Sequence, residues 1–134
     1  MARQVLAGAR LETQVQTRLL RAWDASVADL RDCDGLLLGA AENSGALAGG
    51  MKDFLDRSYY PAQELGLNLP YGLFVSAGND GRQAVAQMQR ILRGYPLREV
   101  HEPVLVRGLP DDNGLQQCRD LGQALAAGMA FGIY

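Results

Sequence analysis

Two short and almost purely apolar segments place the tightest limit on how this chain can fold. Residues 34–40 read Asp-Gly-Leu-Leu-Leu-Gly-Ala, and residues 71–77, directly after Pro70, read Tyr-Gly-Leu-Phe-Val-Ser-Ala. Continuous apolar strands of this kind are typical of a parallel sheet covered on both faces, whereas a half-exposed strand alternates apolar and polar residues. The sequence therefore predicts a buried parallel sheet.

Strand-like and helix-like patterns alternate along the rest of the chain. Two further strands are predicted, at residues 13–20, where apolar and polar residues alternate, and at residues 100–106, where Pro103 favours a sheet edge. Apolar residues recur at helical spacing in segments that contain, in chain order, Val5, Leu30, Phe54, Met88 and Leu121. This alternation predicts a three-layer α/β fold, with four parallel strands and helices on both faces, in a single domain of residues 1–134.

Length and charge restrict the classes of function. The chain has 134 residues, 13 basic and 15 acidic, and a net charge of -2, which argues against a nucleic-acid-binding or basic membrane-surface protein. No apolar run approaches the roughly 20 residues of a membrane-spanning helix. Cys33 and Cys118 form no metal or redox motif and fit a reducing environment, so we expect a cytoplasmic protein.

Common catalytic motifs do not account for the sequence. Gly45 and Gly50 have the spacing of a nucleotide-binding P-loop, but Met51 stands where that motif requires lysine. The Gly-x-Gly-x-x-Gly dinucleotide fingerprint and the Gly-x-Ser-x-Gly nucleophile elbow are also absent. The one histidine, His101, lies beside Glu102 in the predicted edge strand, and we interpret it as structural rather than catalytic.

Other reactive side chains have simple interpretations. The remaining candidates are the carboxylate pairs Asp53/Asp56 and Asp111/Asp112 and the neighbouring tyrosines Tyr59 and Tyr60. The carboxylates fit a solvated helix face and a helix cap better than acid–base or metal chemistry. The tyrosines fit packing at a helix end, and equally the wall of a ligand cleft or a subunit contact.

Ligands of open α/β sheets bind beyond the carboxyl ends of the strands, where the strand order changes direction. This rule selects residues 21–25, 40–50 and 76–81. The second and third of these loops are rich in small residues, which let backbone N–H groups approach a planar or anionic ligand. Ordinary turns remain an alternative interpretation of both loops.

The segment from Asp34 to Arg57, DGLLLGAAENSGALAGGMKDFLDR, resembles the flavodoxin-like family. Within that family it is similar to the flavodoxin-fold NAD(P)H-dependent FMN or quinone reductases, through Gly45, Gly49, Met51, Lys52, Phe54, Asp56 and Arg57. Residues 73–78, Leu-Phe-Val-Ser-Ala-Gly, give a second match, and the resemblance extends over roughly residues 15–134.

The resemblance implies an FMN-dependent oxidoreductase or electron-transfer protein, with NAD(P)H and quinones as small-molecule partners. It places the flavin ring between two loops. The cofactor-binding residues that it implies are Ala41, Glu42, Asn43, Ser44 and Gly45 on one side, and Ser76, Ala77, Gly78, Asn79 and Gly81 on the other. No side chain is assigned to catalysis and none to a metal.

Departures from the family pattern weaken the cofactor prediction. A strand–helix unit takes about 30 residues, so the chain holds about four and a half units, and its half unit is an N-terminal helix at residues 1–10. The family's first strand and its phosphate-binding loop have no counterpart, and Ser44 stands where the family has an aromatic residue. We therefore expect weak FMN binding or none.

The alternative function is a non-catalytic flavodoxin-like binding or assembly module. In the family's strand order, 2-1-3-4-5, loss of strand 1 leaves a gap of two strand spacings, about 9.6 Å. Either the strand at residues 13–20 slides across to pair with residues 34–40, or a second chain fills the gap. We expect the slide, together with assembly into a homo-oligomer.

Overall fold

The computed structural model describes residues 1–95 and 97–134. It contains five helices and five strands in a mixed, mostly parallel sheet. The elements in chain order are α1 (Ala2–Ala9), α2 (Val27–Arg31), β1 (Leu36–Asn43), β2 (Ala46–Leu47), α3 (Gly49–Glu64), β3 (Pro70–Ala77), α4 (Arg82–Gly94), β4 (Arg98–Glu99), β5 (Val104–Arg107) and α5 (Asp112–Ala130).

The strand β3 is the centre of the sheet. It pairs in parallel with β1 on one side and with β4 and then β5 on the other. The small strand β2 folds back antiparallel onto the end of β1. Leu73 and Val75 in β3 are completely buried, as the apolar pattern of residues 71–77 predicts.

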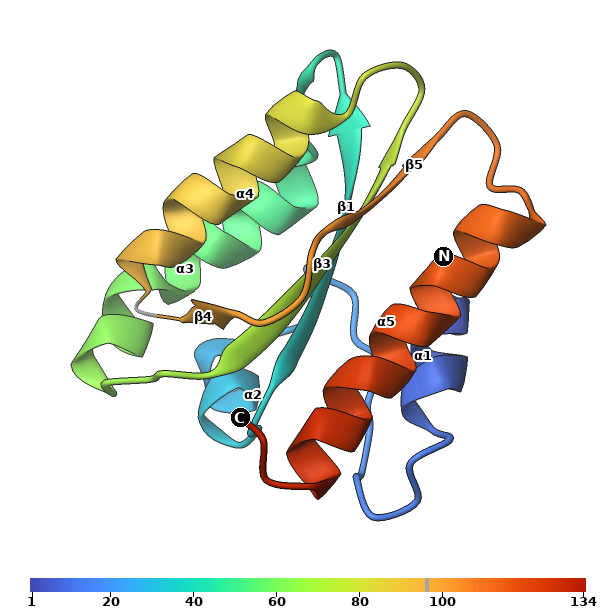
Figure 1. Cartoon of the computed structure of the whole chain (residues 1–134). Helices are drawn as coiled ribbons and strands as arrows, with labels where there is room; N and C mark the ends of the chain where they lie inside the picture. The colour runs from blue at the N-terminus through green and yellow to red at the C-terminus, as the bar shows by residue number, and fades with distance from the viewer. Residues whose placement is uncertain (96) are drawn as a thin grey trace.

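Helices cover both faces of the sheet, which confirms the predicted three-layer α/β architecture. Figure 1 shows α3 and α4 along one face and α5 with α1 along the other. The larger core, between the sheet and the α3–α4 layer, contains Phe54, Leu73 and Met88. The smaller core, on the opposite face, contains Val5, Phe74 and Leu121.

The prediction of a strand at residues 13–20 is wrong. The structure gives this segment no ladder with β1, so the expected slide does not occur either. Alternation of apolar and polar residues is a local signal, whereas a strand also needs a neighbouring strand edge. Figure 1 shows the chain between α1 and α2 as a coil.

The predicted edge strand at residues 100–106 is only partly formed. Its first residues, 100–103, which include Pro103, are irregular; β4 ends before them at Glu99, and β5 follows from Val104 to Arg107. Both pieces pair with β3, and no outer neighbour is present among the described strands. Pro103 therefore lies at the edge of the sheet, as expected for a residue without a ladder donor.

Candidate functional site

The carboxyl ends of β1 and β3 lie side by side and carry the two loops that the sequence selected. Ala41 and Ser76 are Cα partners at the last register position of the β1–β3 ladder. The predicted cofactor residues that follow them along the chain therefore come from adjacent strand ends. We call these two segments the 41–45 turn and the 76–81 loop.

The 41–45 turn is a tight hairpin, whereas the sequence predicted an irregular loop over residues 40–50. Strand β1 continues to Asn43 and returns as β2, through Ser44 and Gly45 with φ angles of 51° and 74°. Two consecutive residues in the left-handed region are typical of the hairpin turn whose twist matches that of the flanking strands. The N–H of Ala48 then donates to the carbonyl of Ala41 at 2.9 Å and closes the hairpin.

Glu42 occupies an unusual position in this hairpin. It pairs with Leu47 across the β1–β2 ladder, and its Oε2 atom is buried without a hydrogen-bond partner among the described residues. The following residues, Asn43, Ser44 and Gly45, are exposed. The exposed tip of the turn is therefore available to a ligand, while one oxygen of Glu42 is hidden from solvent.

Two arginines fix the position of the 76–81 loop through Asp80. Arg82 donates through Nε to Asp80 Oδ1 at 2.6 Å, and Arg107 donates through Nε to the carbonyl of Asp80 at 2.9 Å. Gly81 precedes α4 with φ 73°, and a Cβ there would lie 2.4 Å from Leu105 Cδ1. Only glycine fits this position without strain.

The outer part of the 76–81 loop is open. Gly78 and Asn79 are exposed, and a Cβ on Gly78 would meet no atom within 4 Å. Ser76 is half-buried and Ala77 is buried, because both still belong to β3. The surface that a planar ring could approach is therefore the backbone of residues 78 and 79.

We call the surface formed by the 41–45 turn, the 76–81 loop and the adjoining start of α3 the rim. Trp23 lies at this start of α3, and the sequence analysis assigned it no role at the site. It is 66% exposed, and its indole lies against the start of α3, 2.9 Å from where a Cβ on Gly50 would be. The rule for ligand positions in open α/β sheets selects residues 21–25, and the presence of a tryptophan in that loop was the signal available in the sequence. The rim therefore has one aromatic side chain, although not at Ser44.

Four basic side chains near this rim are paired with aspartates, and a fifth, Arg107, donates to the backbone carbonyl of Asp80. Four ion pairs lie here: Arg21–Asp24, Lys52–Asp56, Arg57–Asp53 and Arg82–Asp80. Arg57 also donates through Nη2 to the carbonyl of Ala22 at 2.6 Å and so ties α3 to the loop of Trp23. A phosphate at this rim would compete with these carboxylates for each of the four cations.

Two hollows in the described surface lie away from both loops. A groove of about 980 Å³ runs beside β1, and a smaller one of about 380 Å³ lies between β2, α3 and α4. Neither is lined by a residue of the 41–45 turn or the 76–81 loop. The predicted flavin site thus lies outside both of these hollows.

The remaining polar candidates have structural roles. Asp111 accepts the N–H of Gly114 at 2.8 Å and caps α5, while Asp53 and Asp56 form ion pairs along α3. His101 Nε2 lies 2.8 Å from the Tyr134 hydroxyl. No group of three potential metal ligands occurs among the described residues.

The tyrosine pair and the cysteines also have no place in the rim. Tyr59 packs edge-on against Tyr60 and Tyr95 near the end of α3, which runs away from the rim. Burial raises the pKa of both the Cys33 and the Cys118 thiols. These thiols stay protonated at neutral pH, which does not suit a nucleophile.

Solved structures with the same architecture are numerous. A flavodoxin from the domain Archaea is 18% identical and superposes with a TM-score of 0.80, over 96% of this chain and 87% of that one. The two-electron reduced flavodoxin of Megasphaera elsdenii is 24% identical, with a TM-score of 0.75, over 94% of this chain and 88% of that one.

A larger protein contains the same unit. Rubredoxin:oxygen oxidoreductase from Desulfovibrio gigas is 17% identical with a TM-score of 0.83, and this chain covers 33% of it while 98% of this chain is matched. No family model and no curated protein matches the sequence. No helix in the described part of the chain is long and apolar enough to cross a membrane. The chain has a flavodoxin-like fold.

Proposed function

We propose that this chain is an electron-transfer protein that holds a flavin ring at the rim formed by the 41–45 turn and the 76–81 loop. The observation that carries the proposal is the alignment of Ala41 with Ser76 at the ends of adjacent parallel strands. Two small-residue loops are thereby placed side by side at the edge of the sheet where ligands of such folds bind. The structural neighbours named as flavodoxins support the choice of ligand.

The ring and the phosphate of FMN fit this rim to different degrees. The open backbone at Gly78 and the exposed hairpin tip at Gly45 leave room for a flat ring. Four cations near the rim are paired with aspartates, and Arg107 is engaged through Nε with the carbonyl of Asp80, so the phosphate would compete with these contacts. We therefore propose weak binding that depends on the ring more than on the phosphate.

When bound, the flavin supplies the one- or two-electron chemistry, and the protein supplies position and shielding. The rigid hairpin at Gly45 and the Asp80 anchor hold the two loops at a fixed separation. Exposure of Gly78 and Asn79 leaves one edge of the ring open to a partner. NAD(P)H as electron donor and a quinone as acceptor are the partners that fit such an open edge.

A titration with two flavins tests both halves of the proposal. Trp23 is the one tryptophan of the chain, so quenching of its fluorescence reports binding near the rim. We expect saturable binding of FMN weaker than micromolar, and riboflavin binding within about threefold of FMN, because the phosphate adds little. If FMN binds far more tightly than riboflavin, the proposal that the phosphate adds little to binding is contradicted.

Variants locate the site. Gly78→Val places a branched side chain in open space and should abolish flavin binding while leaving the fold intact. Tyr60→Ala is the matched control, because this tyrosine is 71% exposed on the part of α3 far from the rim. If the unmodified protein quenches with neither flavin, the electron-transfer function is wrong.

A non-catalytic binding module is the second candidate function. The observation that favours it is the groove of about 980 Å³ beside β1, which shares no residue with the 41–45 turn or the 76–81 loop. A chain that uses this groove has no need of a flavin.

A further inference from the structure

The smaller hollow between β2, α3 and α4 has the composition of a ligand site. Figure 1 shows α3 and α4 side by side on this face of the sheet. The volume of about 380 Å³ lies at the lower end of the range of about 300–1,000 Å³ for small-molecule sites. We call it the α4 hollow; its lining residues are Ala46, Leu47, Lys52, Gln87, Arg90 and Ile91.

The apolar part of the α4 hollow is still partly open to solvent. Ala46 is exposed and Ile91 is half-buried. Leu47 lies deeper, in the larger core, and Ile91 packs against that core. A ligand that covers Ala46 and Ile91 therefore removes apolar surface from water without displacing a core side chain.

Gln87 contributes an amide donor whose orientation is fixed. Its Oε1 atom accepts the N–H of Leu47 at 2.8 Å. Because a backbone N–H can only donate, this contact identifies the oxygen, and the Nε2 group faces away from Leu47. Among the described residues, Gln87 Nε2 has no hydrogen-bond partner, and it is not a buried atom. Its two N–H groups are therefore available to a ligand.

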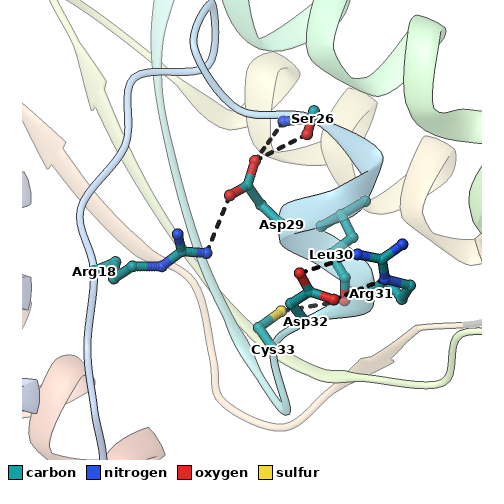
Figure 2. Close-up of polar contacts among 7 residues, drawn as sticks. All are labelled: Arg18, Ser26, Asp29, Leu30, Arg31, Asp32 and Cys33. Carbon is teal, nitrogen blue, oxygen red and sulfur yellow. Dashed lines mark hydrogen bonds and ion pairs between the residues drawn. The ribbon is translucent and has the colours of Figure 1, made fainter.

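Arg90 is the second polar group of the α4 hollow. It follows Gln87 by one helical turn on α4, so the two side chains are neighbours on the helix surface. Within the described part of the chain, Arg90 forms no ion pair. Figure 2 shows the contrasting case of Arg31, which pairs with Asp32. The guanidinium of Arg90 is therefore free to bind an anion.

The surroundings of Arg90 are basic. Residues 81–98 include four arginines and no aspartate or glutamate, although the whole chain has a net charge of -2. Lys52, the other cation that lines the α4 hollow, lies with Nζ 2.6 Å from Asp56 Oδ2, so this pair adds no net charge. Arg90 therefore gives the hollow a net positive charge, which favours an anionic ligand.

We propose that the α4 hollow binds a small organic carboxylate with a short apolar chain. The carboxylate accepts hydrogen bonds from Arg90 and from Gln87 Nε2, and the chain covers Ala46 and Ile91. A planar guanidinium and a neighbouring amide match the two oxygens of a carboxylate. The inference does not depend on flavin binding, because the hollow shares no residue with the 41–45 turn or the 76–81 loop.

The test is a titration of the full chain with sodium hexanoate at constant ionic strength, followed by NMR of the amide groups. We expect saturable shifts of the Gln87 side-chain amide and of the Leu47 and Ile91 backbone amides, with a Kd of about 1–10 mM for so small a ligand. Hexanamide, which has the same chain without the charge, should bind at least about fivefold more weakly. Equal affinity for the acid and the amide, or no saturation below about 50 mM hexanoate, would overturn the proposal.

Two arginine variants locate the site. Arg90→Gln removes the cation of the α4 hollow and should weaken hexanoate binding at least about fivefold. Arg93→Gln is the matched control, because Arg93 is exposed on the same helix and does not line the hollow; its Kd should stay within about twofold of the unmodified protein. Both changes are at exposed positions, so both variants should fold. Equal losses of affinity in the two variants would overturn the proposal in favour of a general attraction of anions to α4.

Discussion

Phe74 lies across the space that Gly39 leaves on the neighbouring strand. The two residues are Cα partners in the β1–β3 ladder, and a Cβ on Gly39 would lie 2.1 Å from Phe74 Cζ. Phe74 is 8% exposed and belongs to the core below α1 and α5. The glycine in the apolar run of residues 34–40 is thus required by a neighbouring ring, not by backbone conformation.

Gly39→Ala is expected to destabilise the protein through this contact. Phe74 has to leave its position, and overpacking of this kind costs about 1–3 kcal/mol. Urea denaturation followed by circular dichroism measures the loss. Gly78→Ala is the control, because a Cβ there meets nothing within 4 Å, and its effect should stay within about 0.5 kcal/mol. Equal midpoints for the two variants would show that Phe74 moves freely.

A second close approach joins α1 to α5. A Cβ on Gly122 would lie 2.0 Å from the carbonyl oxygen of Val5, and one on Gly8 would lie 1.8 Å from the carbonyl oxygen of Arg119. These glycines let the two helix backbones come into contact, which larger residues prevent. In both cases the atom that a Cβ would meet belongs to the backbone of the other helix, which cannot rotate away as a side chain can.

Gly122→Ala should therefore detach α1 from α5. We expect a fall in the free energy of unfolding of about 2 kcal/mol or more, and fast hydrogen exchange of the α1 amides in the variant. Gln123→Ala, at an exposed position of the same helix, tests for a general effect on α5. Retained protection of the amides of Val5 and Ala9 in Gly122→Ala would refute the expectation.

The buried strands were predictable because burial on both faces leaves a continuous apolar signature, as at Leu73 and Val75. The coil at residues 13–20 was not, because its alternating pattern carries no information about whether a partner edge lies within reach. Similarly, Glu42 and Asn43 belong to β1 because they pair with β2 across the hairpin at Ser44. Both residues are polar, so local composition placed the end of the strand too early. The contribution of Trp23 to the rim depends on its contact with the start of α3, which is a tertiary relationship.

Tyr71 should make stability depend on pH in the alkaline range. Burial, and then the charge of Glu99, raises its pKa from 10.0 to about 12. A tyrosine whose pKa is higher in the folded state contributes stability fully below pH 10, and this contribution is lost as the pH rises from about 10 to 12. Allowing for partial solvation, the loss should be about 1–2 kcal/mol.

The measurement compares urea midpoints between pH 8 and 12 for the unmodified protein and for Tyr71→Phe. The variant lacks the titrating hydroxyl, so its midpoint should fall less steeply above about pH 10. The difference between the two curves isolates Tyr71 from the other tyrosines, including Tyr95, whose pKa is also raised by burial. Parallel curves for the two proteins would show that Tyr71 does not cause the decline.

Asp29 should stabilise α2 more than its ion pair alone indicates. The N–H of Ser26 and then its hydroxyl lower the pKa of this carboxyl, and Arg18 contributes less. A carboxyl whose pKa is lower in the folded state contributes stability above about pH 4, and that contribution is lost as the pH falls further. The Asp29→Asn variant should therefore unfold at a lower urea concentration than Arg18→Gln at pH 7, and the difference should shrink toward pH 3. Midpoints in the reverse order at pH 7 would assign the main role to the ion pair between Arg18 and Asp29 (Figure 2).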